Sequence, residues 1–205
     1  MTHRSLGVLL LIAALAFAAA CGDDDDTASG TLAGYVREPT PVVGQLSLPD
    51  VTNGGVPLTF QAPEGELLLV YFGYTSCPDV CPTTLSDVRT ALAELDEEDA
   101  AHIGLAMATV DPDRDVDEVI GGYVQSFVPD ASGLRTTDAA ELRAAADAFG
   151  VEYSVDTNDE GEVEVVHSGS LYVVDDQGQL VLTWPFGTPV DDLINDLRIL
   201  MAAPV

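Results

Sequence analysis

Residues 67–85, LLLVYFGYTSCPDVCPTTL, contain the change of pattern that decides the fold. The first six residues, 67–72, are continuously apolar, which is typical of a central strand buried on both faces. Residues 73–82 then predict a turn into a helix that runs to about Leu95. Pro82 fits the first turn of that helix, where a missing N–H costs nothing. A buried strand that leads into a helix through a cysteine-containing turn indicates an α/β domain.

The flanking segments continue this alternation of strands and helices. Upstream, β-prone stretches in residues 42–62 surround Asn53-Gly54-Gly55 and predict a hairpin. Residues 154–162, SVDTNDEGE, are acidic and predict a loop. We expect further strands at 103–110, near Leu134, at 170–174 and at 180–184, and helices at 115–127, 138–149 and 190–201. The order predicts a mixed central sheet flanked by helices, and a thioredoxin-like fold fits it because the cysteines follow the central strand.

The N-terminus has the pattern of an export signal. Residues 1–20, MTHRSLGVLLLIAALAFAAA, are too short to span a membrane comfortably and end in small residues. Cys21 follows directly and resembles the lipidated first residue of a bacterial lipoprotein, with ordinary secretion and a free Cys21 as the alternative. Residues 21–40 contain four consecutive Asp and predict a flexible acidic linker, so that the folded domain spans 41–205. We therefore expect a protein anchored by lipid on the outer face of the bacterial cytoplasmic membrane.

The chain is strongly acidic. It has 35 acidic residues against 7 basic ones, all Arg, and a formal net charge of -28. Such a surface repels nucleic acid and anionic headgroups, which excludes a DNA-binding or RNA-binding role. The acidity either keeps the protein soluble or favours a partner with a basic patch.

The Cys77–Cys81 pair carries the chemistry of the predicted turn. If both residues were on a helix, their Cβ atoms would lie about 5 to 6 Å apart on one face. A helix N-terminus favours the thiolate, which binds soft metals and attacks disulfides. The pair has one more intervening residue than the common redox spacing Cys-x-x-Cys, which leaves room for an ion. A metal site, a redox pair and a plain disulfide therefore all stay open, with metal favoured.

A third ligand would have to come from elsewhere in the chain. Beyond the signal, histidine occurs only as His102, which precedes a predicted strand and has no neighbouring ligand, and as His167. His167 follows the acidic loop, so it could face the helix start, although the residues alone leave this open. Two Cys and one His suit copper or zinc. Met107 lies within an apolar strand, where a core role is expected.

Three strings in the chain resemble the signature strings of the Sco/SenC family of copper-binding proteins, which assemble cytochrome c oxidase. These strings are FGYTSCPDVCP at 72–82, VDPDRD at 110–115 and HSGSLYVVD at 167–175. They occur in family order, and the resemblance covers about 42–201. Many family members have His where Ser76 stands. Many also use a transmembrane helix as tether, where this chain has a predicted lipid anchor at Cys21.

The resemblance implies a thioredoxin-like fold with an inserted hairpin and one copper ion, Cu(I) or Cu(II), bound by Cys77, Cys81 and His167. It also implies that the chain delivers copper to the copper site of cytochrome c oxidase subunit II. The alternative is a thiol–disulfide oxidoreductase that uses Cys77 and Cys81 to reduce the copper-ligand cysteines of that subunit. Three carboxylates are candidates to support the ligands or contact the partner: Asp79, Asp111 and Asp115. For Asp111 and Asp115, turn formation and helix capping are the alternative.

Overall fold

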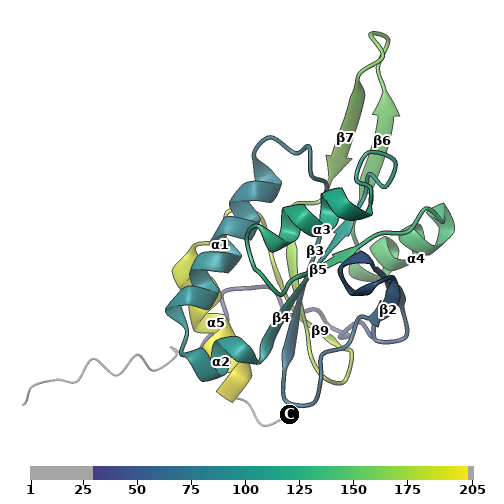
Figure 1. Ribbon diagram of the computed structural model, residues 1–205. Helices are drawn as coiled ribbons and strands as arrows, with labels where there is room; N and C mark the ends of the chain where they lie inside the picture. The colour runs from purple at the N-terminus through teal and green to yellow at the C-terminus, as the bar shows by residue number, and fades with distance from the viewer. Residues whose placement is uncertain (1–29, 203–205) are drawn as a thin grey trace, which may run out of the picture.

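The structure is a computed structural model that describes residues 30–202 (Figure 1). Its strands are β1 (Ser47–Asp50), β2 (Val56–Thr59), β3 (Leu67–Gly73), β4 (Ile103–Thr109), β5 (Ser132–Leu134), β6 (Tyr153–Thr157), β7 (Val163–His167), β8 (Leu171–Val174) and β9 (Leu180–Trp184). Its α-helices are α1 (Val80–Glu94), α2 (Glu97–Ala101), α3 (Asp117–Gln125), α4 (Ala139–Phe149) and α5 (Val190–Ala202), and a 3-10 turn spans Val51–Asn53. Among these described residues, none of the helices has both the length and the apolar character needed to cross a membrane.

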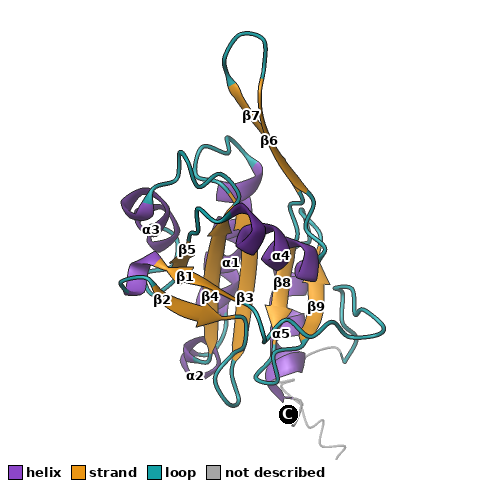
Figure 2. Ribbon diagram, turned by 90° about the vertical axis from the view of Figure 1, so that its right-hand side faces the viewer, coloured by secondary structure: helices purple, strands orange, loops and turns teal. Residues whose placement is uncertain are grey.

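The centre of the described part is a mixed sheet with strand order β2-β1-β5-β4-β3-β8-β9. Every residue of β3 is buried, which confirms the prediction from its continuous apolar run. β3 pairs in parallel with β4 and antiparallel with β8. Figure 2 shows α4 in front of this sheet and α1 behind it. The mixed α/β architecture and the thioredoxin-like arrangement predicted from the sequence are confirmed.

The two faces of the sheet bury two separate apolar clusters. Alternate residues of β3 point to opposite sides. Leu69 and Tyr71 pack in the cluster that includes α1 and α5, whereas Val70 and Phe72 pack with α4. Met107, on β4, is fully buried in the first cluster, in agreement with the expected core role. The first cluster extends to Cys81, so the core continues directly into the predicted site.

Most predicted elements are present with shifts of a few residues at their ends, but the loop predicted at 154–162 is confirmed only for 158–162 and is wrong for 154–157. Residues 153–157 and 163–167 form the antiparallel hairpin β6–β7, which projects from the domain (Figures 1 and 2). Its strands are mostly exposed, so they lack the apolar face from which strands are recognised in a sequence. The short helix α2 was also missed, because Glu97–Ala101 is too short and polar to show a helical period.

The packed part of the chain begins before the predicted boundary at Pro41. Tyr35 bridges to Thr183 on the edge strand β9. The backbone N–H groups of Ala33 and Gly34 donate to the buried Asp196 carboxylate at 2.8 and 2.9 Å. The end of the predicted flexible linker is therefore bound to the domain. The predicted signal at 1–20 and Cys21 lie outside the described residues.

Replacing Asp196 with Ala should release this N-terminal segment and lower the free energy of unfolding by about 2 kcal/mol. Asp196 also accepts a 2.8 Å hydrogen bond from the Trp184 indole N–H, which would be left buried without an acceptor. The backbone donors near Gly34 can return to water, which limits the loss. Urea unfolding measures the effect, and Asp191→Ala, an exposed carboxylate on the same helix, is the control. Equal stability of the two variants would contradict this role of Asp196.

Candidate metal centre

The two cysteines meet at the N-terminal end of α1, but not because both lie on one helical face. The helix begins at Val80, so Cys77 belongs to the preceding turn, and the helical spacing assumed from the sequence is wrong for this pair. Cys77 Sγ accepts a hydrogen bond from the Cys81 backbone N–H at 3.3 Å. The sulfur thus takes one of the free N–H groups of the first helical turn. Both cysteines are free thiols, with Cys77 half-buried and Cys81 fully buried.

His167 approaches the thiols from the base of the β6–β7 hairpin. Its Nε2 lies 3.4 Å from Cys81 Sγ. The ligand atoms of Cys77, Cys81 and His167 all lie within 4.8 Å of one another, and they are the one group of three potential metal ligands found among residues 30–202. The structure thus brings together the three residues predicted as ligands. Two soft sulfurs and one imidazole form a donor set suited to copper or zinc.

A second contact orients the His167 ring. Its Nδ1 lies 3.0 Å from the carbonyl oxygen of Ser168. A carbonyl can only accept, so Nδ1 carries the hydrogen and the lone pair of the neutral ring is on Nε2, the nitrogen that faces Cys81. Burial lowers the pKa of His167, and the carbonyl groups of Ser168 and Phe72 oppose this only in part. The ring is therefore neutral near pH 7 and has a free lone pair directed at the thiols.

The two thiols differ in acidity. Burial raises the pKa of Cys77, but hydrogen bonds from the backbone N–H groups of Cys81 and Asp79 outweigh it, and the pKa lies below its ordinary value. Burial raises the pKa of Cys81 to about 12. Cys77 is therefore the accessible, more readily ionised sulfur. Cys81 ionises only when a cation compensates the buried charge.

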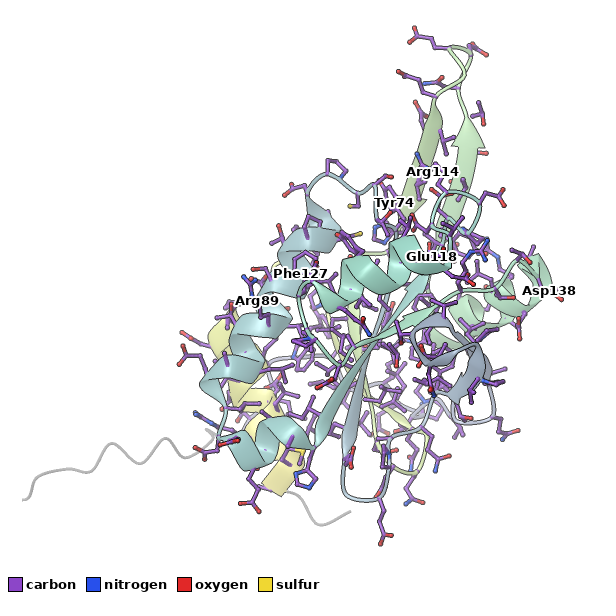
Figure 3. All side chains as sticks on the ribbon, viewed as in Figure 1. Tyr74, Arg89, Arg114, Glu118, Phe127 and Asp138 are labelled. Carbon is purple, nitrogen blue, oxygen red and sulfur yellow. The ribbon has the colours of Figure 1, made fainter. Side chains whose placement is uncertain are left out.

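Two tyrosines hold the imidazole edge-on. The ring centroids of Tyr71 and Tyr74 lie 6.2 and 5.6 Å from that of His167, with interplanar angles of 82° and 88°. The Arg114 guanidinium lies 5.9 Å from the centroid of Tyr74, and Figure 3 shows these two side chains close to the base of the hairpin. Tyr74 and Arg114 were not identified from the sequence. The aromatic residues flanking Gly73 were the available signal, but an aromatic residue beside a buried strand is first interpreted as part of the hydrophobic core.

Asp115 supports the segment between β3 and α1 that carries Cys77, here called the cysteine loop. The side chain is fully buried. Its carboxylate accepts from the Thr75 backbone N–H at 3.0 Å, from the Thr75 hydroxyl at 2.5 Å and from the Thr109 hydroxyl at 2.6 Å. Thr75 lies two residues before Cys77, so Asp115 fixes the position from which the cysteine loop starts. It is not one of the three clustered ligands.

The other predicted carboxylates also lie outside the ligand cluster. Asp111 is buried and pairs with Arg114, and its carbonyl oxygen accepts from the backbone N–H of Asp115. It thus forms a turn, as in the alternative predicted from the sequence, but neither Asp111 nor Asp115 caps α3, which begins after Val116 without a side-chain cap. Asp79 is exposed at the start of α1 and makes no capping hydrogen bond.

The pH dependence of copper-free stability should reveal the buried His167. Because the folded pKa lies below the unfolded value near 6.5, the unfolded chain binds more protons below that pH, and stability falls as the pH falls. Replacing His167 with Gln should remove this dependence, which one proton limits to about 1.4 kcal/mol per pH unit. Urea unfolding between pH 7.5 and 5.5 measures it. His102→Gln is the control, since His102 is exposed and directly precedes β4. An equal slope in wild type and His167→Gln would contradict the prediction.

Comparisons with known proteins agree with this geometry. The SCO1/SenC family model matches residues 37–202. An SCO2-like protein of Rickettsia prowazekii is 36% identical over 117 residues, which cover 56% of this chain and 56% of that protein. The chain matches between 39% and 66% of the length of the first curated relatives.

Solved structures show the same likeness. Apo Sco1 of Thermus thermophilus is similar with a TM-score of 0.71 and 32% identity, covering 82% of this chain and 96% of that one. Copper-bound ScoI of Bradyrhizobium japonicum is similar with a TM-score of 0.63 and 28% identity, and the match covers 75% of this chain and 95% of that one. Because the family model spans nearly all of the described domain, including the two cysteines and the histidine, this chain belongs to the SCO1/SenC family.

Proposed function

We propose that this protein binds one copper ion through Cys77, Cys81 and His167 and delivers it to the copper site of cytochrome c oxidase subunit II. The observation that carries the proposal is the convergence of the three ligand atoms within 4.8 Å. Copper-bound relatives of the same fold support the choice of copper over zinc. The copper ion is the cargo, taken up and released by exchange of thiolate ligands.

The position of the site suits ligand exchange. Cys77 is half-buried and lines an open groove with Tyr74, Val166 and His167. A partner thiolate can therefore reach the ion from the side of Cys77, while Cys81 holds it from within. The predicted lipid anchor at Cys21 would restrict this encounter to the outer face of the membrane, where the oxidase subunit presents its copper domain.

A copper titration of the reduced protein under anaerobic conditions tests the proposal. We expect one Cu(I) per chain for the wild type and a weaker affinity for His167→Ala, measured by competition with a chromogenic chelator. His102→Ala, which removes the other histidine of the domain, should bind like the wild type. Absence of specific copper binding by the wild type would overturn the proposal.

The unequal acidity of the thiols supports a second candidate, reduction of the copper-ligand cysteines of the oxidase subunit. Cys77 is the more accessible of the two thiols and has the lowered pKa, as expected of an attacking thiol, and Cys81 would resolve the mixed disulfide. The partner disulfide is reduced, the Cys77–Cys81 pair is oxidised, and an external reductant must restore it. A metal-free assay with the oxidised subunit distinguishes the two, because His167→Ala should retain this activity.

A further inference from the structure

The hydroxyl of Tyr71 has no hydrogen-bond partner, although Tyr71 is completely buried. Buried polar groups are almost always paired, so an orphaned hydroxyl points to a partner that is present only in another state of the protein. The ring lies on β3, on the side of the sheet that carries Cys81 and Met107. The missing partner should therefore be sought at the metal site.

The packing above Gly73 places Tyr71 against the sulfur of Cys81. A Cβ atom at Gly73 would lie 2.7 Å from Tyr71 Cε1 and 2.9 Å from Cys81 Sγ. The absent side chain at Gly73 lets the phenol and the thiol share this space. Thr84 is the other polar group near Tyr71, and its hydroxyl donates to the Val80 carbonyl at 2.9 Å.

Copper binding changes how strongly the Cys81 sulfur accepts a hydrogen bond. A thiol is a weak acceptor, whereas a thiolate accepts strongly, above all where water is excluded. Two thiolates around one Cu(I) also leave a net charge of -1 in a protein whose formal charge is already -28. A donor beside the buried sulfur would stabilise that charge more than one exposed to solvent.

We propose that Tyr71 is a positioning residue of the metal site, whose hydroxyl donates to the Cys81 sulfur once copper binding has removed the thiol proton. This inference rests on the proposed copper binding and adds a specific donor to it. In the copper-free protein the Tyr71 hydroxyl forms no hydrogen bond. In the copper-loaded protein it donates one to the Cys81 thiolate. The donor thus favours the loaded state over the free one, because the hydrogen bond to the thiolate forms only there.

Tyr71→Phe removes only the hydroxyl and tests the proposal in the full chain. We expect Cu(I) affinity, measured by chelator competition, to fall about tenfold to a hundredfold, as for a hydrogen bond to a charged group. The stability of the copper-free protein in urea should be unchanged or slightly higher, since an unsatisfied hydroxyl has been removed. In the Cu(II)-loaded protein, the sulfur-to-copper charge-transfer band should shift to longer wavelength, because an unbonded thiolate gives up charge more easily.

Tyr172→Phe is the matched control. Tyr172 is buried on the opposite face of the sheet. Burial raises the pKa of its hydroxyl, and Arg37 and Ser170 lower it in part. This variant should lose stability and keep its copper affinity and its charge-transfer band.

The outcomes separate the two proposals. If the wild type binds copper and Tyr71→Phe binds it equally well with an unshifted band, the role of Tyr71 is overturned and copper binding stands. If Tyr71→Phe instead destabilises the copper-free protein, the hydroxyl serves Thr84 and the inference is likewise overturned. If the wild type binds no copper, both proposals fall.

Discussion

Replacing Cys81 with Ser is expected to lower Cu(I) affinity by several powers of ten. Cys81 is completely buried, and its sulfur lies 3.4 Å from His167 Nε2 and close to Cys77. A serine hydroxyl is a hard ligand that does not ionise at neutral pH, so it cannot replace a thiolate for a soft cation. Since a few ligands share a metal-binding free energy of about 10 kcal/mol or more, the loss of one has a large effect.

Chelator competition with the reduced protein measures this loss, and far-ultraviolet circular dichroism checks that the variant is folded. Cys21→Ser is the matched control, because it removes the one cysteine outside the Cys77–Cys81 pair, which the sequence pattern assigns to lipidation. It should bind copper like the wild type. An affinity of Cys81→Ser within tenfold of the wild type would show that Cys81 is not a ligand.

Replacing Asp115 with Ala is expected to lower the free energy of unfolding by about 3 to 5 kcal/mol, because it leaves three donors that face this buried carboxylate without their acceptor. These donors are the Thr75 backbone N–H and the hydroxyls of Thr75 and Thr109. For a chain of this size, the loss corresponds to a decrease in Tm of about 10 °C. Copper affinity should fall as well, since the loop that carries Cys77 starts at Thr75.

Thermal and urea unfolding of the copper-free protein measure the first effect, and copper competition measures the second. Asp113→Ala is the control, because Asp113 lies two residues away and is exposed. Asp115→Asn should fall between wild type and Asp115→Ala, since the amide keeps one acceptor oxygen. If Asp115→Ala were as stable as Asp113→Ala, the carboxylate would not hold the loop.

The elements that could be predicted from the sequence are those whose burial shows in the local pattern of apolar residues. β3 is a run of apolar residues, and α4 has its capping residue Asp138 and its terminal Gly150 in place. The hairpin β6–β7 could not be recognised in this way. Its backbone groups are satisfied by pairing between its own strands while its side chains stay exposed, so hydrophobicity does not mark it.

The roles of Asp111 and Asp115 could likewise not be distinguished from the sequence. Asp111 and Asp115 look alike in the string VDPDRD, and the sequence left ligand support and turn formation open for both. The structure assigns Asp115 to the cysteine loop and Asp111 to an ion pair with Arg114. Their partners come from β4, the loop after β3 and the same turn. Which donors reach a carboxylate depends on tertiary packing, which no local sequence pattern shows.

By itself, the sequence determined the order of the buried strands and the longer helices, and the place of Cys77 and Cys81 after a buried strand, because periodicity and turn residues act over a few neighbours. Only the tertiary structure decided that His167, 86 residues from Cys81, faces the thiols with Nε2 and that Tyr71 lies beneath them. Such contacts between distant residues form when the sheet pairs β3 with β8 and sets the base of the hairpin beside α1. Local propensity determines the elements, and the packing of their apolar faces brings the ligands together.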